Sequence, residues 1–178
     1  FKRMHHAQYM HVKNKSLIEI HWNFGISSFF KLTSEDIWDE VTVDPAGHYK
    51  LSPDMMVVLL LIHHHMHAFR ELKILVDVLW ALYAYEDRID WPAFADKLEK
   101  IGLIKITRIT LGQINCLWQD SAQKMRGLKA LDQETAKLGH AEPAFLHAYF
   151  KMNVETHGPF QNKKDSVVFR LALDRWPV

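Results

Sequence analysis

The chain has 178 residues, of which 48% are hydrophobic, so one well-buried globular domain is expected and a disordered chain is excluded. The 22 Lys and Arg residues against 21 Asp and Glu leave a net charge of +1, which gives no reason to expect a nucleic-acid or anionic-membrane partner. The 7 glycines and 6 prolines exclude collagen-like and linker-like chains and favour helices joined by short loops.

The chain carries one cysteine, Cys116, and therefore cannot form an internal disulfide. This favours a reducing compartment, and we expect a cytoplasmic protein in which Cys116 is a buried small hydrophobe. The longest apolar run, residues 55–62, is about half of the roughly 18 residues needed to span a bilayer, and no signal-peptide pattern opens the chain. Because the chain begins at Phe1 in a basic, histidine-rich stretch, we expect further residues to precede it in a parent protein.

Residues 16–24, SLIEIHWNF, alternate in a pattern that predicts a β-strand. Ile18 and Ile20 fall on one side of this strand, and Glu19 and His21 fall on the other. A single strand cannot satisfy its own edges, and the rest of the sequence offers few candidates to pair with it. We therefore expect the partner strands to lie upstream of the chain.

The following segments predict a connection that leads into helix. Residues 34–40 predict a short helix, and residues 44–47 predict a turn. A long helical region starts at Ser52, a good N-cap that is followed by Pro53. Because this region is long for one globular helix, we expect a break near residues 68–70.

Further helices are expected along the rest of the chain. Asp90 caps a helix that ends near Gly102, and residues 104–114 are assigned to helix by their spacing. The remaining helices are expected at residues 121–138, 143–153 and 164–174. The chain thus divides into a strand region with its connection, residues 1–50, and a helical domain, residues 51–178. The expected fold class is α+β and predominantly α-helical.

Glu19 and His21 form the first group of residues that suits a chemical site. A strand holds its side chains rigidly, and a rigid carboxylate suits Mg²⁺, which demands near-octahedral oxygen ligation. From the spacing alone, a solvent-facing Glu and His on an amphipathic strand are the more common alternative.

His63 and His67 form a second group, because residues four apart share one face of a helix. Zinc sites use this spacing, but the Glu that serves as the base of HExxH metalloproteases is replaced by His64, so that function is excluded. Three alternatives stay open: packing within a helical core, contact with a substrate phosphate, and metal binding. His64 and His65 are expected to be peripheral.

Asp77 lies in the apolar stretch Leu75 to Leu79, where an ionised carboxylate needs a partner. His67 and Lys73 are the candidate partners, and a structural hydrogen bond is favoured over a catalytic role.

Four features, in order, resemble a family of uncharacterised nucleotidyltransferases related to the DNA-polymerase-β-like superfamily. IEIHW is similar to the family's strand, with its acidic residue, His and Trp. The intervening Ile37-Trp38 and LSPDMM also fit, HHHMHAFRELKILVD resembles the H-x-x-x-H helix with its Leu-Lys and Asp, and Ile89-Asp90-Trp91 resembles the I-D-W helix start. The resemblance covers roughly residues 17–118.

The resemblance implies transfer of a nucleotidyl group from a nucleoside triphosphate to an unknown acceptor, with Mg²⁺ ions held by three carboxylates. Glu19 would be the third carboxylate and a metal ligand. The first two belong, in the family, to a D-x-D strand after a Gly-Gly or Gly-Ser turn, and that element is missing from this sequence. We therefore expect these residues to be an incomplete and inactive portion of the parent protein, a remnant of the nucleotidyltransferase strand unit followed by a helical bundle.

The resemblance also implies a substrate-binding role for four residues. It implies that His21, His63, His67 and Asp77 contact the nucleotide or the acceptor. The alternative is a non-catalytic helical protein- or peptide-binding module that keeps the nucleotidyltransferase scaffold.

Overall fold

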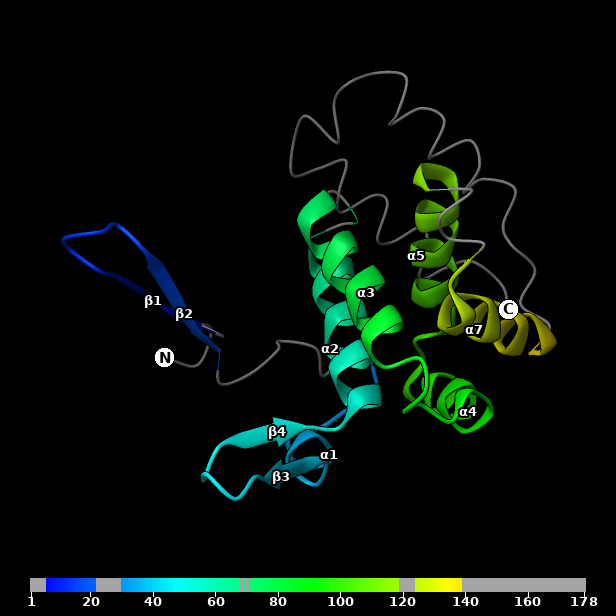
Figure 1. The fold of residues 1–178 in the computed structure, drawn as a ribbon, viewed down its shortest axis with the longest axis horizontal. Coiled ribbons are helices and arrows are strands. Elements are labelled where there is room, and N and C mark those ends of the chain that lie inside the picture. The colour runs from blue at the N-terminus through cyan, green and yellow to red at the C-terminus, as the bar shows by residue number, and fades with distance from the viewer. Residues whose placement is uncertain (1–5, 22–29, 68, 70, 119–123, 139–178) are drawn as a thin grey trace.

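The computed structural model describes residues 6–21, 30–67, 69, 71–118 and 124–138 (Figure 1). Its elements in chain order are β1 (His6–Met10), β2 (Leu17–His21), α1 (Ser34–Trp38), β3 (Val41–Val43), β4 (Tyr49–Leu51), α2 (Pro53–Met66), α3 (Leu72–Ala84), α4 (Trp91–Ile101), α5 (Ile104–Leu117) and α7 (Arg126–Lys137). The expected class, α+β and predominantly α-helical, is confirmed. The helices expected at residues 143–153 and 164–174 lie outside the described residues. None of the described helices is long and apolar enough to cross a membrane.

Strands β1 and β2 form an antiparallel hairpin. Its turn is closed by Asn14, whose side-chain oxygen accepts hydrogen bonds from the Ser16 amide at 3.1 Å and the Ser16 hydroxyl at 2.6 Å. The expected strand is confirmed over residues 17–21. Its partner strand, β1, lies within the chain, whereas we expected the partner strands to lie upstream of the chain. The pairing was missed because His6–Met10 lies within the basic, histidine-rich stretch that opens the chain, which masks its short alternation of polar and apolar residues.

A second hairpin, β3 and β4, follows the short helix α1 and was predicted only as a connection with a turn. Helix α1 begins with a capping box, in which the Asp36 amide donates to the Thr33 hydroxyl at 3.2 Å and the Thr33 amide donates to the Asp36 carboxylate at 2.7 Å. The Thr33 amide and the Thr33 hydroxyl, which also donates to the Asp36 carboxylate at 2.8 Å, hold the pKa of Asp36 below its usual value. Figure 1 shows α1, β3 and β4 together beside the start of α2.

A charged network fastens this corner to the helices. The Lys97 ammonium on α4 donates to Glu40 at 2.6 Å and to Asp54 at 2.5 Å. The Ser52 hydroxyl donates to Glu40 at 2.5 Å and accepts from the Met55 amide at 3.2 Å, which caps α2 as predicted. Burial disfavours the charged form of Lys97, but the hydrogen bonds to the two carboxylates outweigh it and raise the pKa of the lysine.

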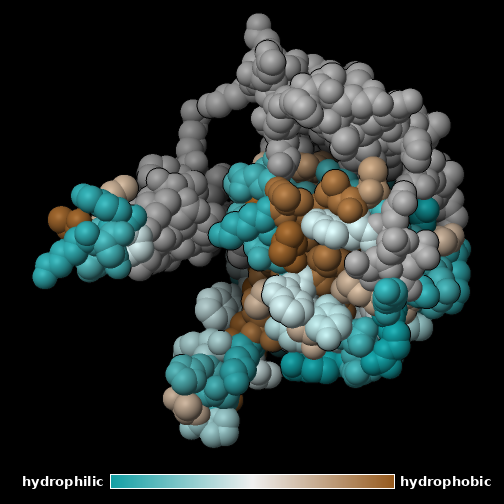
Figure 2. Space-filling view, turned by 45° about the horizontal axis from the view of Figure 1, so that its top comes forward, coloured by the Kyte–Doolittle hydropathy of each residue, from teal (hydrophilic) through white to brown (hydrophobic). Residues whose placement is uncertain are grey.

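Helices α2 and α3 are the predicted long helical region, and it breaks between Met66 and Leu72 as expected. Helix α2 is apolar on most of its sides and packs against α3 and α5. The outer face of α3 is also apolar, and Figure 2 shows hydrophobic side chains gathered on one face of the helical body. The exposed apolar residues of α3 are Leu72, Val76, Trp80 and Tyr83.

The last three described helices complete the bundle. Asp90 caps α4 through the Ala93 amide at 3.2 Å, and Gly102 ends that helix at a φ of +88°, as predicted. Residues 104–117 are helical, which confirms the assignment of this β-branched stretch. Helix α7 begins at Arg126 and packs against α3, α4 and α5.

Three burial predictions are wrong. His64 and His65 were expected to be peripheral, but both are buried, because α2 is covered on the side that carries them. Cys116 was expected to be buried, but it is exposed near the end of α5. These outcomes depend on which neighbouring helices cover each face, and the local sequence does not specify that.

Gly127 on α7 generates a stability prediction. A Cβ atom at this position would lie 2.6 Å from the Leu82 carbonyl oxygen and 2.9 Å from a Trp91 ring carbon. We expect Gly127→Ala to lower the free energy of unfolding by about 1–3 kcal/mol, because the helices must separate to admit the methyl group. Chemical denaturation measures this, with the exposed Lys129→Ala as a control on the same helix. Equal stability of the two variants would contradict the close packing.

Candidate functional site

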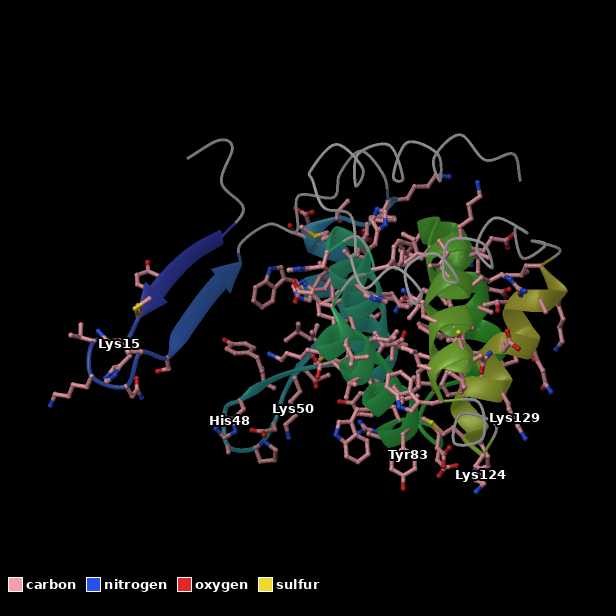
Figure 3. All side chains as sticks on the ribbon, turned by 90° about the horizontal axis from the view of Figure 1, so that it is seen from above. Lys15, His48, Lys50, Tyr83, Lys124 and Lys129 are labelled. Carbon is pink, nitrogen blue, oxygen red and sulfur yellow. The ribbon has the colours of Figure 1, made fainter. Side chains whose placement is uncertain are left out.

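The strand β2 carries Glu19 and His21, the predicted metal ligand and its neighbour. The backbone register places Glu19 opposite Gln8 and His21 opposite His6. Figures 1 and 3 both show the β1–β2 hairpin to one side of the helical bundle. The structure therefore does not bring this strand next to the predicted residues of α2 and α3.

The end of α2 brings His63 and His67 together, as the four-residue spacing predicts. Their rings meet edge to face, with centroids 4.6 Å apart. His67 is the C-cap of α2, and its Nδ1 atom lies 2.5 Å from the Glu71 carboxylate. The side chains of His67 and Glu71 are 38% and 51% exposed, so this pair faces solvent.

The turn between α2 and α3 is fixed by Phe69. This residue has a φ of +59°, a left-handed conformation that few residues with a side chain adopt. The Phe69 ring is buried with centroid distances of 5.1 Å to His64 and 5.5 Å to His65, and the Gln113 amide donates to the Phe69 carbonyl at 3.0 Å. These contacts hold the turn, and with it the position of the His67–Glu71 pair.

The buried His64 connects the turn between α2 and α3 to helix α5. It is 1% exposed, and its Nδ1 atom lies 3.3 Å from the Thr110 hydroxyl on α5. Burial, with a smaller contribution from the neighbouring histidines 63, 65 and 67, lowers the pKa of His64 to about 4. His64 is therefore neutral at pH 7 and serves the fold, whereas His63 and His67 lie nearer the surface.

Asp77 lies half-exposed on α3. We expected His67 or Lys73 to be its partner, and this expectation is wrong, because His67 pairs with Glu71 and Lys73 does not reach the carboxylate. Within the described part of the chain, Asp77 forms no hydrogen bond or ion pair.

The described residues do not make a metal centre by themselves, because no three of their His, Cys, Asp or Glu side chains are arranged to hold an ion. The His67–Glu71 pair offers different chemistry. When Nδ1–H donates to Glu71, the ring is oriented and Nε2 keeps a lone pair that can accept a hydrogen bond or a proton. Glu71 was missed in the sequence, because His67 caps the end of α2 and Glu71 caps the start of α3, so the spacing of one helix face does not pair them.

Comparison with known proteins gives one match. A family model described as an uncharacterised nucleotidyltransferase matches residues 2–119. No curated protein and no solved structure matches the chain. The matched range includes both the β1–β2 hairpin and the helices that carry the histidines and Asp77.

His64 generates a prediction about pH. Its pKa in the folded protein is about 4, below the ordinary value of 6.5, so the unfolded chain binds the proton more readily. The contribution of the neutral His64 ring to the free energy of unfolding is fully present above about pH 6.5. It is lost as the pH falls towards 4, by up to about 3 kcal/mol. We expect His64→Gln to lose less unfolding free energy than the wild type between pH 7 and pH 4.

Urea denaturation at a series of pH values measures this difference. The control is His48→Gln, because His48 lies on an exposed loop. Parallel pH profiles for the wild type and His64→Gln would refute the assignment of a buried, neutral imidazole.

Proposed function

Because the family model covers more than half of the chain, the chain belongs to the family of uncharacterised nucleotidyltransferases, and we propose that it serves nucleotidyl transfer. The donor is a nucleoside triphosphate, and Glu19 contributes a carboxylate to the Mg²⁺ site. The observation that carries this proposal is the position of Glu19 within the IEIHW motif, on a paired strand inside the matched region.

The proposal requires ligands that these 178 residues do not contain. The sequence has no D-x-D pair after a Gly-Gly or Gly-Ser turn, and the described residues hold no metal cluster. Glu19 therefore acts with two further carboxylates of the parent protein, and the 178 residues alone are inactive. Mg²⁺ bound there would neutralise charge on the triphosphate.

The helical residues contribute substrate contacts in this proposal. Glu71 orients His67 so that its Nε2 atom meets the nucleotide or the acceptor, and His63 supports the His67 ring from one turn earlier. Asp77, whose carboxylate is uncommitted within the described residues, offers a hydrogen-bond acceptor on the next helix. His21 shares with Glu19 one side of the alternating strand pattern and acts beside it on β2, away from the helical residues (Figure 1).

The non-catalytic binding module stays the alternative function, and no observation at these residues favours it over transfer. A cytoplasmic location also stays a prediction. The two functions differ in one measurable property, namely Mg²⁺-dependent release of pyrophosphate from a nucleoside triphosphate by the parent protein.

We expect Glu19→Gln in the parent protein to lower kcat by at least about 100-fold, since a metal ligand supplies several kcal/mol of charge stabilisation. Release of pyrophosphate at saturating Mg²⁺ and triphosphate measures the effect. The matched control is Glu35→Gln, which changes an exposed carboxylate on α1. Full activity of Glu19→Gln would remove Glu19 from the metal site, and no transfer by the unmodified parent protein would favour the binding module.

A second prediction concerns His67. We expect His67→Gln to raise KM by about 10-fold and to change kcat less, because the imidazole contacts substrate and holds no metal. Glu71→Gln should give a smaller increase in KM, because Glu71 acts only by orienting the ring. A fall in kcat at unchanged KM would assign His67 to the chemical step and contradict a binding role.

A further inference from the structure

The corner formed by α1, β3, β4 and α2 carries an open pocket of about 230 Å³. Six of its seven lining residues are aliphatic or aromatic: Ile37, Trp38, Val41, Tyr49, Leu51 and Leu59. The seventh is Lys50. Leu59 lies one turn before His63 on α2, but His63, His67 and Glu19 do not line the pocket, and the proposed transfer does not use it.

The register of the hairpin explains why one of its faces is apolar. Val41 pairs with Leu51, and Val43 pairs with Tyr49. Because residues two apart in a strand share a face, these four residues lie on the same face of the hairpin. Val41 and Leu51 are half-buried at the base of the hairpin. Val43 and Tyr49 are 60% and 74% exposed, so the apolar face extends beyond the part that the helices cover.

Trp38 enlarges this exposed surface. Its ring meets the Tyr49 ring edge to face at a centroid distance of 6.4 Å, and 66% of the residue is exposed. Exposed Trp and Tyr side chains beside a pocket are the residues that most often dominate the binding energy of protein interfaces. Trp38 and Tyr49 form the aromatic rim of the pocket.

The hairpin is held in shape before any partner arrives. The Asp44 carboxylate accepts hydrogen bonds from the Ala46 amide at 2.9 Å and the His48 amide at 3.0 Å, and it pairs with the Lys50 ammonium at 2.9 Å. Figure 3 shows His48 and Lys50 near the outer end of the hairpin. The Asp44 carboxylate thus balances the charge of Lys50. Because its turn is already ordered, the hairpin loses little conformational entropy when a ligand fills the pocket.

The charge beside the pocket is negative. Helix α1 carries Glu35, Asp36 and Asp39, all exposed, and no basic side chain of the described residues pairs with any of the three. Lys97 is already committed to Glu40 and Asp54. An acidic flank of this kind repels a triphosphate and attracts lysine or arginine.

We propose that this corner binds an extended, basic peptide segment of a partner protein. One large apolar side chain of the segment enters the pocket against Trp38 and Tyr49, and flanking lysines or arginines pair with Glu35 and Asp39. Because β3 and β4 pair only with each other among the described residues, each has an outer edge at which the peptide backbone can add hydrogen bonds. The inference is independent of nucleotidyl transfer.

The test uses a blocked pentapeptide in which one phenylalanine stands between two pairs of lysines. We expect saturable shifts of the Trp38 indole resonance when this peptide is titrated into the isotope-labelled chain. Replacing the phenylalanine by alanine, or the four lysines by glutamates, should weaken binding by at least about 10-fold.

Variants of the chain localise the site. Binding to the variants is followed by the backbone amide resonances of Val43 and Tyr49, which every variant keeps. Trp38→Ala and the double change Glu35→Gln with Asp39→Asn should each weaken binding by about 10-fold, and Trp80→Ala, which changes an exposed tryptophan on α3, should leave it unchanged. Amide spectra check that each variant is folded. The proposal is overturned if the lysine peptide does not bind, if the glutamate peptide binds equally well, if Trp38→Ala and Trp80→Ala behave alike, or if a nucleoside triphosphate shifts the same resonances.

Discussion

The structure depends on the burial of α2, a helix whose sequence is apolar on almost every side. A helix of this kind is stable in water only when other elements surround it. Helices α3 and α5 pack against it, and Leu59 faces the corner formed by α1 and the second hairpin. Helix α7 packs in turn against α3 and α5, and with α4 it completes the bundle.

The two ends of α2 have different chemistry because polar groups are restricted to them. At its start, Ser52 and Asp54 join a network with Glu40 and Lys97, which fixes the corner that carries the aromatic rim. At its end the histidines differ in burial: His64 is buried against α5, and His67 is exposed to solvent beside Glu71. One helix thus positions both the pocket and the candidate substrate-binding residues.

The elements that sequence reasoning predicted well are those set by local signals. Ser52, Asp90 and Gly102 fix helix ends through hydrogen bonds or backbone conformation within a few residues, and each does so in the structure. Strand pairing was poorly predicted, because His6–Met10 and Val41–Val43 are stabilised by partners rather than by their own pattern. The buried histidines and the pairing of His67 with Glu71 rather than with Asp77 likewise depend on packing between segments. The family was recognisable because its motifs are short and contiguous, whereas the spatial relation of Glu19 to the helices is a property of the whole fold.

The exposure of Cys116 has a practical consequence for the purified protein. A solvent-facing thiol oxidises with a second thiol, and each copy of this chain carries just one. Air oxidation of these 178 residues can therefore link two copies and then stops, because the product has no thiol left. A covalent dimer that disappears on adding a reductant reports this oxidation and says nothing about association of the native protein. The same thiol accepts one maleimide dye or spin label per chain, near the end of α5, without any substitution.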